Sequence, residues 1–216
     1  MPGESGGGAC DIISDVTSPK SQKQAPGKRN SLRIIGGGWR GRRVHFPDSP
    51  GLRPTPDRVR ETLFNWLQFS LAGTRCLDLF AGSGALGFEA LSRGARELMF
   101  VEEATPVVES LREELERLEG TARARVLQTT AARYLGQPGE PFDVIFLDPP
   151  FAQDALAEPV ALIESGGWIK PGGWVYLEAE RQSGPPLLPT GWDLVKSKSA
   201  GEVGYHLARV RPRLGQ

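Results

Sequence analysis

The alternation of strand-like and helix-like segments from Arg75 onward constrains the fold of this 216-residue chain more than any other feature. Near-continuous apolar strands separated by helices are typical of a parallel sheet that is covered by helices on both faces. We therefore expect an α/β fold built around such a sheet. The predicted strands are 75–80, 97–102, 124–128, 142–148 and 174–180, and the predicted helices are 83–94, 105–120, 130–135 and 153–165.

Both ends of the chain depart from this alternation. The runs 192–199 and 203–210 straddle a glycine-containing turn and predict an antiparallel pair. Residues 1–30 have little to bury and predict a disordered tail. Residues 31–56 predict a glycine-turned hairpin with arginine side chains, followed by a turn-rich loop. The main domain is then expected over 57–216, with Asp57 as the N-cap of its first helix and Thr105 as the N-cap of a later one.

Charge is unevenly distributed along the chain, although the formal net charge is zero. Residues 28–60 hold nine Lys and Arg residues against two acids, whereas the remainder is acidic. A basic segment on an acidic body fits a contact with nucleic acid, and a solvated arginine-rich face fits it equally well. No apolar run is long enough to span a bilayer, no secretory signal is evident, and the two cysteines lack a metal-type spacing. We expect a monomeric cytoplasmic protein without metal.

A glycine-rich turn follows the first strand of the alternating region. It reads DLFAGSG over residues 78–84, and Glu102 ends the next strand. Glycines let the backbone pass close to a ligand, and a carboxylate at this point can accept hydrogen bonds from a ribose diol. The spacing of Gly82, Gly84 and Gly87 thus predicts a nucleoside site at the carboxyl edge of the sheet, although a purely structural turn gives the same pattern.

Asp78 distinguishes between the nucleoside ligands that this turn could hold. The glycine pattern also fits NAD, but a carboxylate beside a pyrophosphate is repelled in a partly dry crevice. A ligand that carries an amino-acid ammonium and a sulfonium suits Asp78 better. S-adenosylmethionine has both groups, together with a ribose for Glu102, and is the predicted cofactor.

The strand 142–148 ends in an acid, two prolines and an aromatic ring: Asp148, Pro149, Pro150 and Phe151. Prolines remove backbone donors, so that the Asp148 carboxylate and the Pro149 carbonyl can converge on a group with two hydrogens. An exocyclic amino group of a nucleobase is such a donor, and Phe151 offers a face for the base to stack on. Acceptors on both N–H groups stabilise the positive charge that develops on nitrogen during methyl transfer. A proline turn without function is the alternative.

At these motifs the sequence resembles a known family. DLFAGSG and LDPPF look like the cofactor and catalytic motifs of amino-methylating S-adenosylmethionine-dependent methyltransferases, which include adenine-N6 and guanine-N2 enzymes. The segment 33–67 is similar to the N-terminal signature of the bacterial 16S rRNA guanine-N2 methyltransferases of the small ribosomal subunit. This resemblance covers about residues 31–210. It implies a Rossmann-like fold with a seven-stranded sheet and an N-terminal hairpin, and guanine 966 of 16S rRNA, in the subunit or its assembly intermediate, as the target.

The family resemblance also implies roles for particular residues. The cofactor positions fall on Asp78, Phe80, Gly82, Ser83, Gly84, Glu102, Thr130 and Ala131, and the catalytic positions on Asp148, Pro149, Pro150 and Phe151. The loop-and-helix signature that faces cofactor and RNA falls on Arg53, Pro54, Thr55, Arg58, Arg60 and Glu61. This sequence departs from the family at Ala104, where relatives often carry an acid, and at Thr130, where Asn or Asp is common.

Phosphate contacts are expected from the hairpin, where arginines fix the register of RNA without reading its sequence. The predicted RNA-binding residues are Arg33, Arg40, Arg42, Arg43, Arg53, Thr55, Arg58 and Arg60. Glu178 and Glu180 end a later strand near the site, and surface acids explain them as well. Three other functions remain open: an adenine-N6 methyltransferase, an assembly factor that holds S-adenosylmethionine without catalysis, and a dehydrogenase.

Overall fold

The protein is described by a computed structural model over residues 30–150 and 155–212. The predicted tail, apart from Asn30, and Phe151 lie outside these residues. The strands are β1 (Asn30–Arg33), β2 (Arg43–Phe46), β3 (Arg75–Asp78), β4 (Glu97–Glu102), β5 (Ala124–Gln128), β6 (Phe142–Leu147), β7 (Ile169–Glu180), β8 (Trp192–Ala200) and β9 (Val203–Val210). The helices are α1 (Asp57–Trp66), α2 (Ala85–Ser92), α3 (Thr105–Arg117), α4 (Ala131–Leu135), α5 (Ala157–Ser165) and the short 3-10 helix η1 (Arg181–Ser183).

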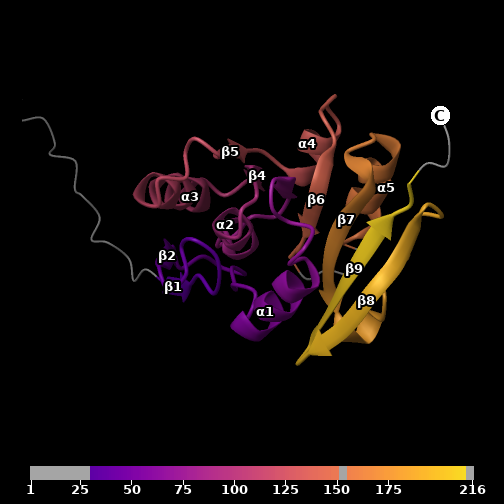
Figure 1. Ribbon diagram of the computed structural model, residues 1–216, viewed down its shortest axis with the longest axis horizontal. Coiled ribbons are helices and arrows are strands. Elements are labelled where there is room, and N and C mark those ends of the chain that lie inside the picture. Colours follow the sequence, from indigo (N-terminus) through magenta and orange to yellow (C-terminus); the bar gives the residue numbers. More distant parts are fainter. Residues whose placement is uncertain (1–29, 151–154, 213–216) are drawn as a thin grey trace, which may run out of the picture.

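Seven strands form the main sheet, in the order β5-β4-β3-β6-β7-β9-β8 (Figure 1). Strands β3 to β7 run parallel, and β9 runs antiparallel to both β7 and β8. The predicted parallel sheet and its antiparallel final pair are therefore confirmed. Because the order reverses between β3 and β6, a crevice is expected outside their carboxyl ends, which is where such folds bind ligands.

Helices cover both faces of the sheet, as the near-continuous apolar strands predicted. One apolar core lies under α1, α2 and α3 and includes Cys76, Phe146 and Tyr176. The other lies under α4 and α5 and includes Ile145 and Val175. Successive residues of one strand alternate between the two cores, because side chains along a strand point to opposite faces. No helix among residues 30–150 and 155–212 is both long and apolar enough to cross a membrane.

Two helices begin one residue earlier than predicted. Asp57 is the first residue of α1 rather than its N-cap, and Pro56 takes the cap position without a side-chain bond. The Asp57 carboxylate instead binds Arg60 at 2.6 Å. Thr105 is likewise the first residue of α3, and its hydroxyl accepts a hydrogen bond from the Gln128 amide. In both cases a side-chain partner takes the group that would have capped the helix.

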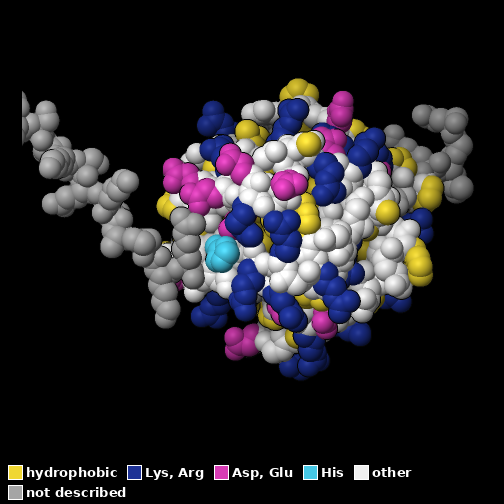
Figure 2. Space-filling view, turned by 60° about the vertical axis from the view of Figure 1, so that its left-hand side comes forward, with side chains coloured by type: hydrophobic (Ala, Val, Ile, Leu, Met, Phe, Trp, Pro, Cys, Tyr) yellow, Lys and Arg dark blue, Asp and Glu magenta, His cyan; other side chains and the backbone are white. Residues whose placement is uncertain are grey.

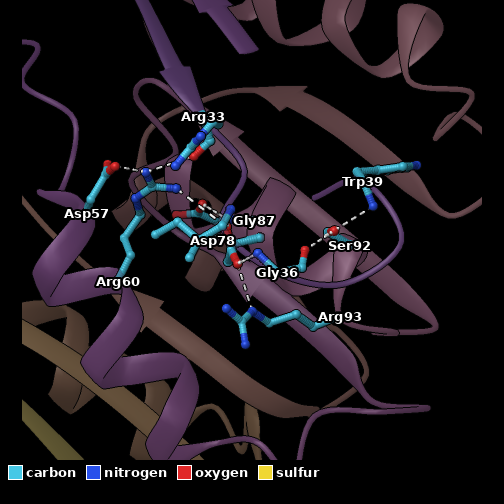
Figure 3. A network of polar contacts seen from close by, with 11 residues as sticks. Arg33, Gly36, Trp39, Asp57, Arg60, Asp78, Gly87, Ser92 and Arg93 are labelled. Carbon is cyan, nitrogen blue, oxygen red and sulfur yellow. Dashed lines mark hydrogen bonds and ion pairs between the residues drawn. The ribbon is translucent and has the colours of Figure 1, made fainter. Parts of the chain in front are cut away.

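The N-terminal hairpin is confirmed: β1 and β2 pair antiparallel. The loop between them lies against the C-terminal end of α2 (Figure 3). The carboxylate of Glu89 accepts from the backbone N–H groups of Ile35 and Gly36, and the Ser92 hydroxyl accepts from the N–H of Trp39. A side chain at Gly37 would meet the Ser92 carbonyl oxygen at 1.9 Å, so only glycine permits this approach.

Candidate active site at the carboxyl edge of the sheet

Four acidic residues follow the same face of the sheet to its carboxyl edge. Each stands two residues beyond a side chain of the core under α1 to α3, and residues two apart on a strand share a face. The pairs are Cys76 with Asp78, Phe100 with Glu102, Phe146 with Asp148, and Tyr176 with Glu178. The sheet therefore brings carboxyl groups from β3, β4, β6 and β7 to one edge.

The glycine turn leads directly from β3 into α2. Gly82 and Gly84 have positive φ angles of 49° and 73°, and Gly84 is the N-cap of α2. Gly87 has a different task, because a side chain there would meet the ring of Phe100 at 2.2 Å. The first two glycines thus shape the turn, and the third brings α2 close to β4.

Glu102 is held rigidly beside this turn. One carboxylate oxygen accepts from the N–H of Gly82 at 2.9 Å, and the other accepts from the N–H groups of Glu103 and Ala104 at 2.9 Å each. The oxygen that accepts from Gly82 has a second lone pair and can still accept a hydrogen bond from a ribose hydroxyl. Fixing by backbone donors sets the direction in which the carboxylate faces the crevice.

Asp78 is only 2% exposed, and its carboxylate accepts from the N–H of Gly87 at 3.0 Å. Burial raises the pKa of Asp78 well above its usual range, the Gly87 bond opposes this rise, and the charges of Asp148 and Glu102 add to it. No basic residue is among the causes of this shift. A ligand cation would therefore stabilise the ionised form of Asp78.

Asp148 follows β6 at the same edge and is partly buried. The Thr55 hydroxyl, from the loop before α1, donates to its Oδ2 at 3.2 Å. Burial raises the pKa of Asp148 to about 6, and the Thr55 bond opposes the rise. Pro149 is buried and Pro150 is exposed. Phe151, the predicted stacking ring, lies outside the described residues.

Glu178, which the sequence left open between an acid near the site and a surface acid, lies at the acidic edge. It is 3% exposed, so the interpretation as a surface acid is wrong for Glu178, whereas Glu180 is exposed. The buried Tyr176 hydroxyl donates to the Glu178 carboxyl group at 2.7 Å. Burial, followed by the charge of Asp148, raises the pKa of Glu178 to about 8. The available signal was its position, since Glu178 follows the apolar run of β7 as Asp148 follows that of β6.

Thr130, the predicted adenine contact, is the N-cap of α4. Its hydroxyl accepts from the N–H of Arg133 at 3.2 Å, and Thr130 itself is exposed. Ala131 begins the helix and is partly buried against the second core. The contact with adenine stays a prediction. Residues 30–150 and 155–212 contain no group of three or more His, Cys, Asp or Glu side chains arranged to hold a metal ion.

The predicted RNA contacts fall into two groups. Six arginines are exposed: Arg33, Arg40, Arg42, Arg43, Arg53 and Arg58. Basic side chains gather on the face that carries the hairpin (Figure 2). A groove of about 400 Å³ lies between the hairpin and the following loop and is lined by Ser31, Leu32, Arg33, Arg43, Pro54, Thr55, Pro56 and Asp57. This groove joins the arginines of the hairpin to the residue that touches Asp148.

Arg60 and Thr55 do not belong to that exposed group, and the burial of Arg60 speaks against its predicted contact with RNA, whereas Thr55 lines the groove and its contact stays a prediction. Arg60 is 1% exposed, and its guanidinium binds Asp57, the Arg33 carbonyl oxygen and, at 3.5 Å, the buried Glu89 (Figure 3). It anchors α1 to the hairpin and α2 instead of meeting phosphate. Thr55 is 6% exposed and faces the acids of the site.

The sheet order and the acidic edge with its glycine turn define a methyltransferase with a Rossmann-like fold. The chain belongs to the family described as Conserved hypothetical protein 95, whose model matches residues 32–209. It is 48% identical over 176 residues to ribosomal RNA small subunit methyltransferase D of Escherichia coli K12, covering 82% of this chain and 88% of that protein. The corresponding protein of Haemophilus influenzae is 43% identical over 187 residues, which cover 85% and 96% of the two chains.

Solved structures agree with this assignment. A structure described as a putative methyltransferase, yhhF, from Escherichia coli has a TM-score of 0.80 and 42% identity, and the match covers 85% of this chain and all of that one. The Thermus thermophilus 16S rRNA N2 G1207 methyltransferase, solved with AdoMet and guanosine, has a TM-score of 0.60 and 25% identity, over 85% of this chain and 50% of that one. The predicted family and fold class are therefore confirmed.

Proposed function

We propose that this protein transfers a methyl group from S-adenosylmethionine to the exocyclic N2 of one guanine in 16S rRNA of the small ribosomal subunit, guanine 966 by family resemblance. The observation that carries the proposal is the placement of Asp148. It ends β6 beside the glycine turn, next to two prolines, and on the same face of the sheet as the cofactor acids. The names of the relatives support rRNA of the small subunit as the substrate.

The residues of the turn fit S-adenosylmethionine. The buried Asp78 has no cation among the described residues that shift its pKa, and the cofactor's ammonium would supply one. Glu102 would accept from the ribose hydroxyls, and Gly82 leaves the backbone open beside it. Thr130 and Ala131 would lie near the adenine. When bound, the cofactor supplies an electrophilic methyl group.

Asp148 would act on the other reactant. Its carboxylate and the Pro149 carbonyl would accept the two hydrogens of the guanine amino group and orient the nitrogen toward the methyl group. Nitrogen gains positive charge as the new bond forms, and acceptors aimed at its hydrogens stabilise that charge. With a pKa of about 6, Asp148 is ionised at neutral pH and can take the proton that nitrogen releases afterwards.

RNA would approach over the hairpin face. The exposed arginines would contact phosphates, and the groove between the hairpin and Thr55 would lead the chain toward Asp148. The target base must leave its stack to reach the carboxylate, which costs a few kcal/mol and less in a loop. We propose that the phosphate contacts are made by the six exposed arginines, Arg33, Arg40, Arg42, Arg43, Arg53 and Arg58.

The test is incubation of the protein with methyl-labelled S-adenosylmethionine and four substrates: undermethylated small subunits, their assembly intermediates, naked rRNA and DNA. Digestion and nucleoside mass spectrometry identify the product. N2-methylguanosine at one rRNA position is expected. N6-methyladenosine would replace the proposal by its adenine alternative, and binding of the cofactor without any transfer would support the assembly factor.

A further inference from the structure

Asp148 and Glu178 stand side by side at the ends of two neighbouring parallel strands. Phe146 pairs with Tyr176 and Leu147 with Leu177, so the next positions in register are Asp148 and Glu178. Neighbouring strands lie about 4.8 Å apart, and residues that share a register point to the same face. The two carboxyl groups therefore form a pair of adjacent acceptors.

A donor from another part of the chain occupies this pair. The Thr55 hydroxyl donates to Asp148 at 3.2 Å, and its closeness to Glu178 also lowers the pKa of that group against the rise caused by burial. Thr55 thus sits where two acceptors converge. The Tyr176 hydroxyl donates to Oε1 of Glu178 and so fixes the orientation of that carboxyl group. The second oxygen of Glu178 is left for a donor on the side of Asp148.

Among residues 30–150 and 155–212, no basic side chain shifts the pKa of either acid of this pair. The pKa values of Asp148 and Glu178 are both raised by burial. Buried acceptors without a cation are stabilised by N–H or O–H donors. Thr55 and Tyr176 donate one hydrogen each, which is fewer than the two carboxyl groups can accept, so the pair has room for further donors.

We propose that Glu178 accepts the N1–H of the target guanine while Asp148 accepts from its N2 amino group, so that the carboxyl pair selects guanine. This inference rests on the proposed function. Guanine presents N1–H and N2–H₂ as neighbouring donors on its Watson–Crick edge, which is how enzymes read a flipped base. Adenine with its amino group at Asp148 would turn the lone pair of N1 toward Glu178. Thr55 would give up its place to the base.

The experiment compares guanine with 2-aminopurine at the methylated position of a small-subunit particle assembled from rRNA fragments. 2-Aminopurine keeps the amino group but lacks N1–H. Rates are measured at about pH 8.5, just above the pKa of about 8 of Glu178, so that the ionised carboxylate, which has no proton to offer to N1, is the majority form. Wild type should prefer guanine by about 100-fold or more in kcat/KM. Glu178→Gln should reduce this preference by about tenfold or more, because its amide can donate to the bare N1.

Controls separate this role from a structural one. Glu180→Gln, an exposed acid two residues further on, should leave the preference unchanged. If Glu178→Gln does not fold, Tyr176→Phe decides, since freeing Glu178 should also lower the preference. An unaltered ratio with both rates reduced would overturn the inference, as would a wild type that accepts both bases equally. In these cases N2-methylguanosine is still formed, whereas methylation of adenine alone would reject the proposed function as well.

Discussion

The hydroxyl of Thr55 donates a hydrogen bond to the carboxylate of Asp148, although 93 residues separate them in the sequence. This bond joins the loop that follows the hairpin to the end of β6. It also opposes the effect of burial on Asp148, because a donor stabilises the ionised carboxylate. The loop that would receive RNA is therefore in direct contact with the group that would receive the base.

Replacing Thr55 should shift the pH dependence of methyl transfer. Activity needs ionised Asp148 and should fall as pH drops through about 6. Thr55→Val removes the donor, which raises the pKa further, so the acidic limb should move to higher pH. Thr55→Ser keeps the hydroxyl and should retain the wild-type limb. Profiles of kcat/KM between pH 5 and 8 report the ligand-free enzyme, in which Thr55 donates to Asp148, and superimposed profiles for Val and wild type would refute this role.

Asp148→Ala should abolish transfer and leave the cofactor bound. Loss of an acceptor aimed at developing charge costs about 10²- to 10³-fold in rate, and loss of orientation adds to it. The cofactor's expected partners, Asp78 and Glu102, keep their backbone bonds in this variant. Calorimetry should give an unchanged dissociation constant for S-adenosylmethionine. Turnover at the wild-type rate would remove Asp148 from the mechanism.

The buried ion pair of Arg60 and Glu89 should be costly to break from one side. Both side chains are fully buried, and Glu89 also holds the hairpin loop. Arg60→Met leaves Glu89 with its other cation, Arg93, at 2.7 Å, but it removes the donors to Asp57 and to the Arg33 carbonyl oxygen, so it should lower the free energy of unfolding by about 1–3 kcal/mol. Arg58→Met, on the exposed side of the same helix, should change it by less than about 0.5 kcal/mol. Urea denaturation distinguishes the two.

Charge reversal at the groove should weaken RNA binding in a salt-dependent way. Arg33 and Arg43 face each other across the hairpin, and both line the groove. Like charges directly opposite on paired strands repel, which a phosphate between them would relieve. The double change to Glu should reduce the slope of log K against log salt by about 1.5–2. Lys198→Glu, on the edge strand β8, is the control and should leave the slope unchanged. An unaltered slope in the double variant would show that other residues contact the phosphates.

The stability of the ligand-free protein should fall as pH rises between about 4.5 and 8. Glu178 has a folded-state pKa of about 8 against an ordinary value of 4.5, so the folded state binds more protons than the unfolded state in this window. This rise of the pKa corresponds to a loss on the order of 5 kcal/mol. Glu178→Gln has no proton to lose and should flatten the curve. Thermal melts across the window test this, and equal slopes would contradict it.

The fold followed from the sequence because its signals are local. Runs such as Val144 to Leu147 are apolar at every position, and this pattern belongs to a strand that is covered on both faces. The starts of α1 and α3 were each misplaced by one residue. Other side chains bind the groups that were expected to cap these helices. Arg60 donates to the carboxylate of Asp57, and the Gln128 amide donates to the hydroxyl of Thr105. A propensity rule for caps contains no information about such partners.

The site was only partly accessible to the same reasoning. Asp78 and Glu102 end their strands and Asp148 directly follows one, so a motif places them at the sheet edge. Arg60 looks like its exposed neighbours in a basic segment, and only the tertiary structure reveals its partner Glu89 in another helix. Glu178 gives no motif, because its environment is made by Thr55 and Asp148, which come from other parts of the chain.

The contact of Gly37 with the Ser92 carbonyl has a consequence for how a target could be chosen. The backbone of the hairpin loop lies directly against the backbone at the end of α2, and no flexible side chain separates the two segments. The arginine-bearing hairpin and the Asp148 carboxylate are thus both held by the main domain, so the distance between them is fixed. A fixed distance would select the nucleotide by the length of RNA between the phosphate that the hairpin contacts and the base that leaves its stack. One inserted residue in the hairpin loop would change this distance.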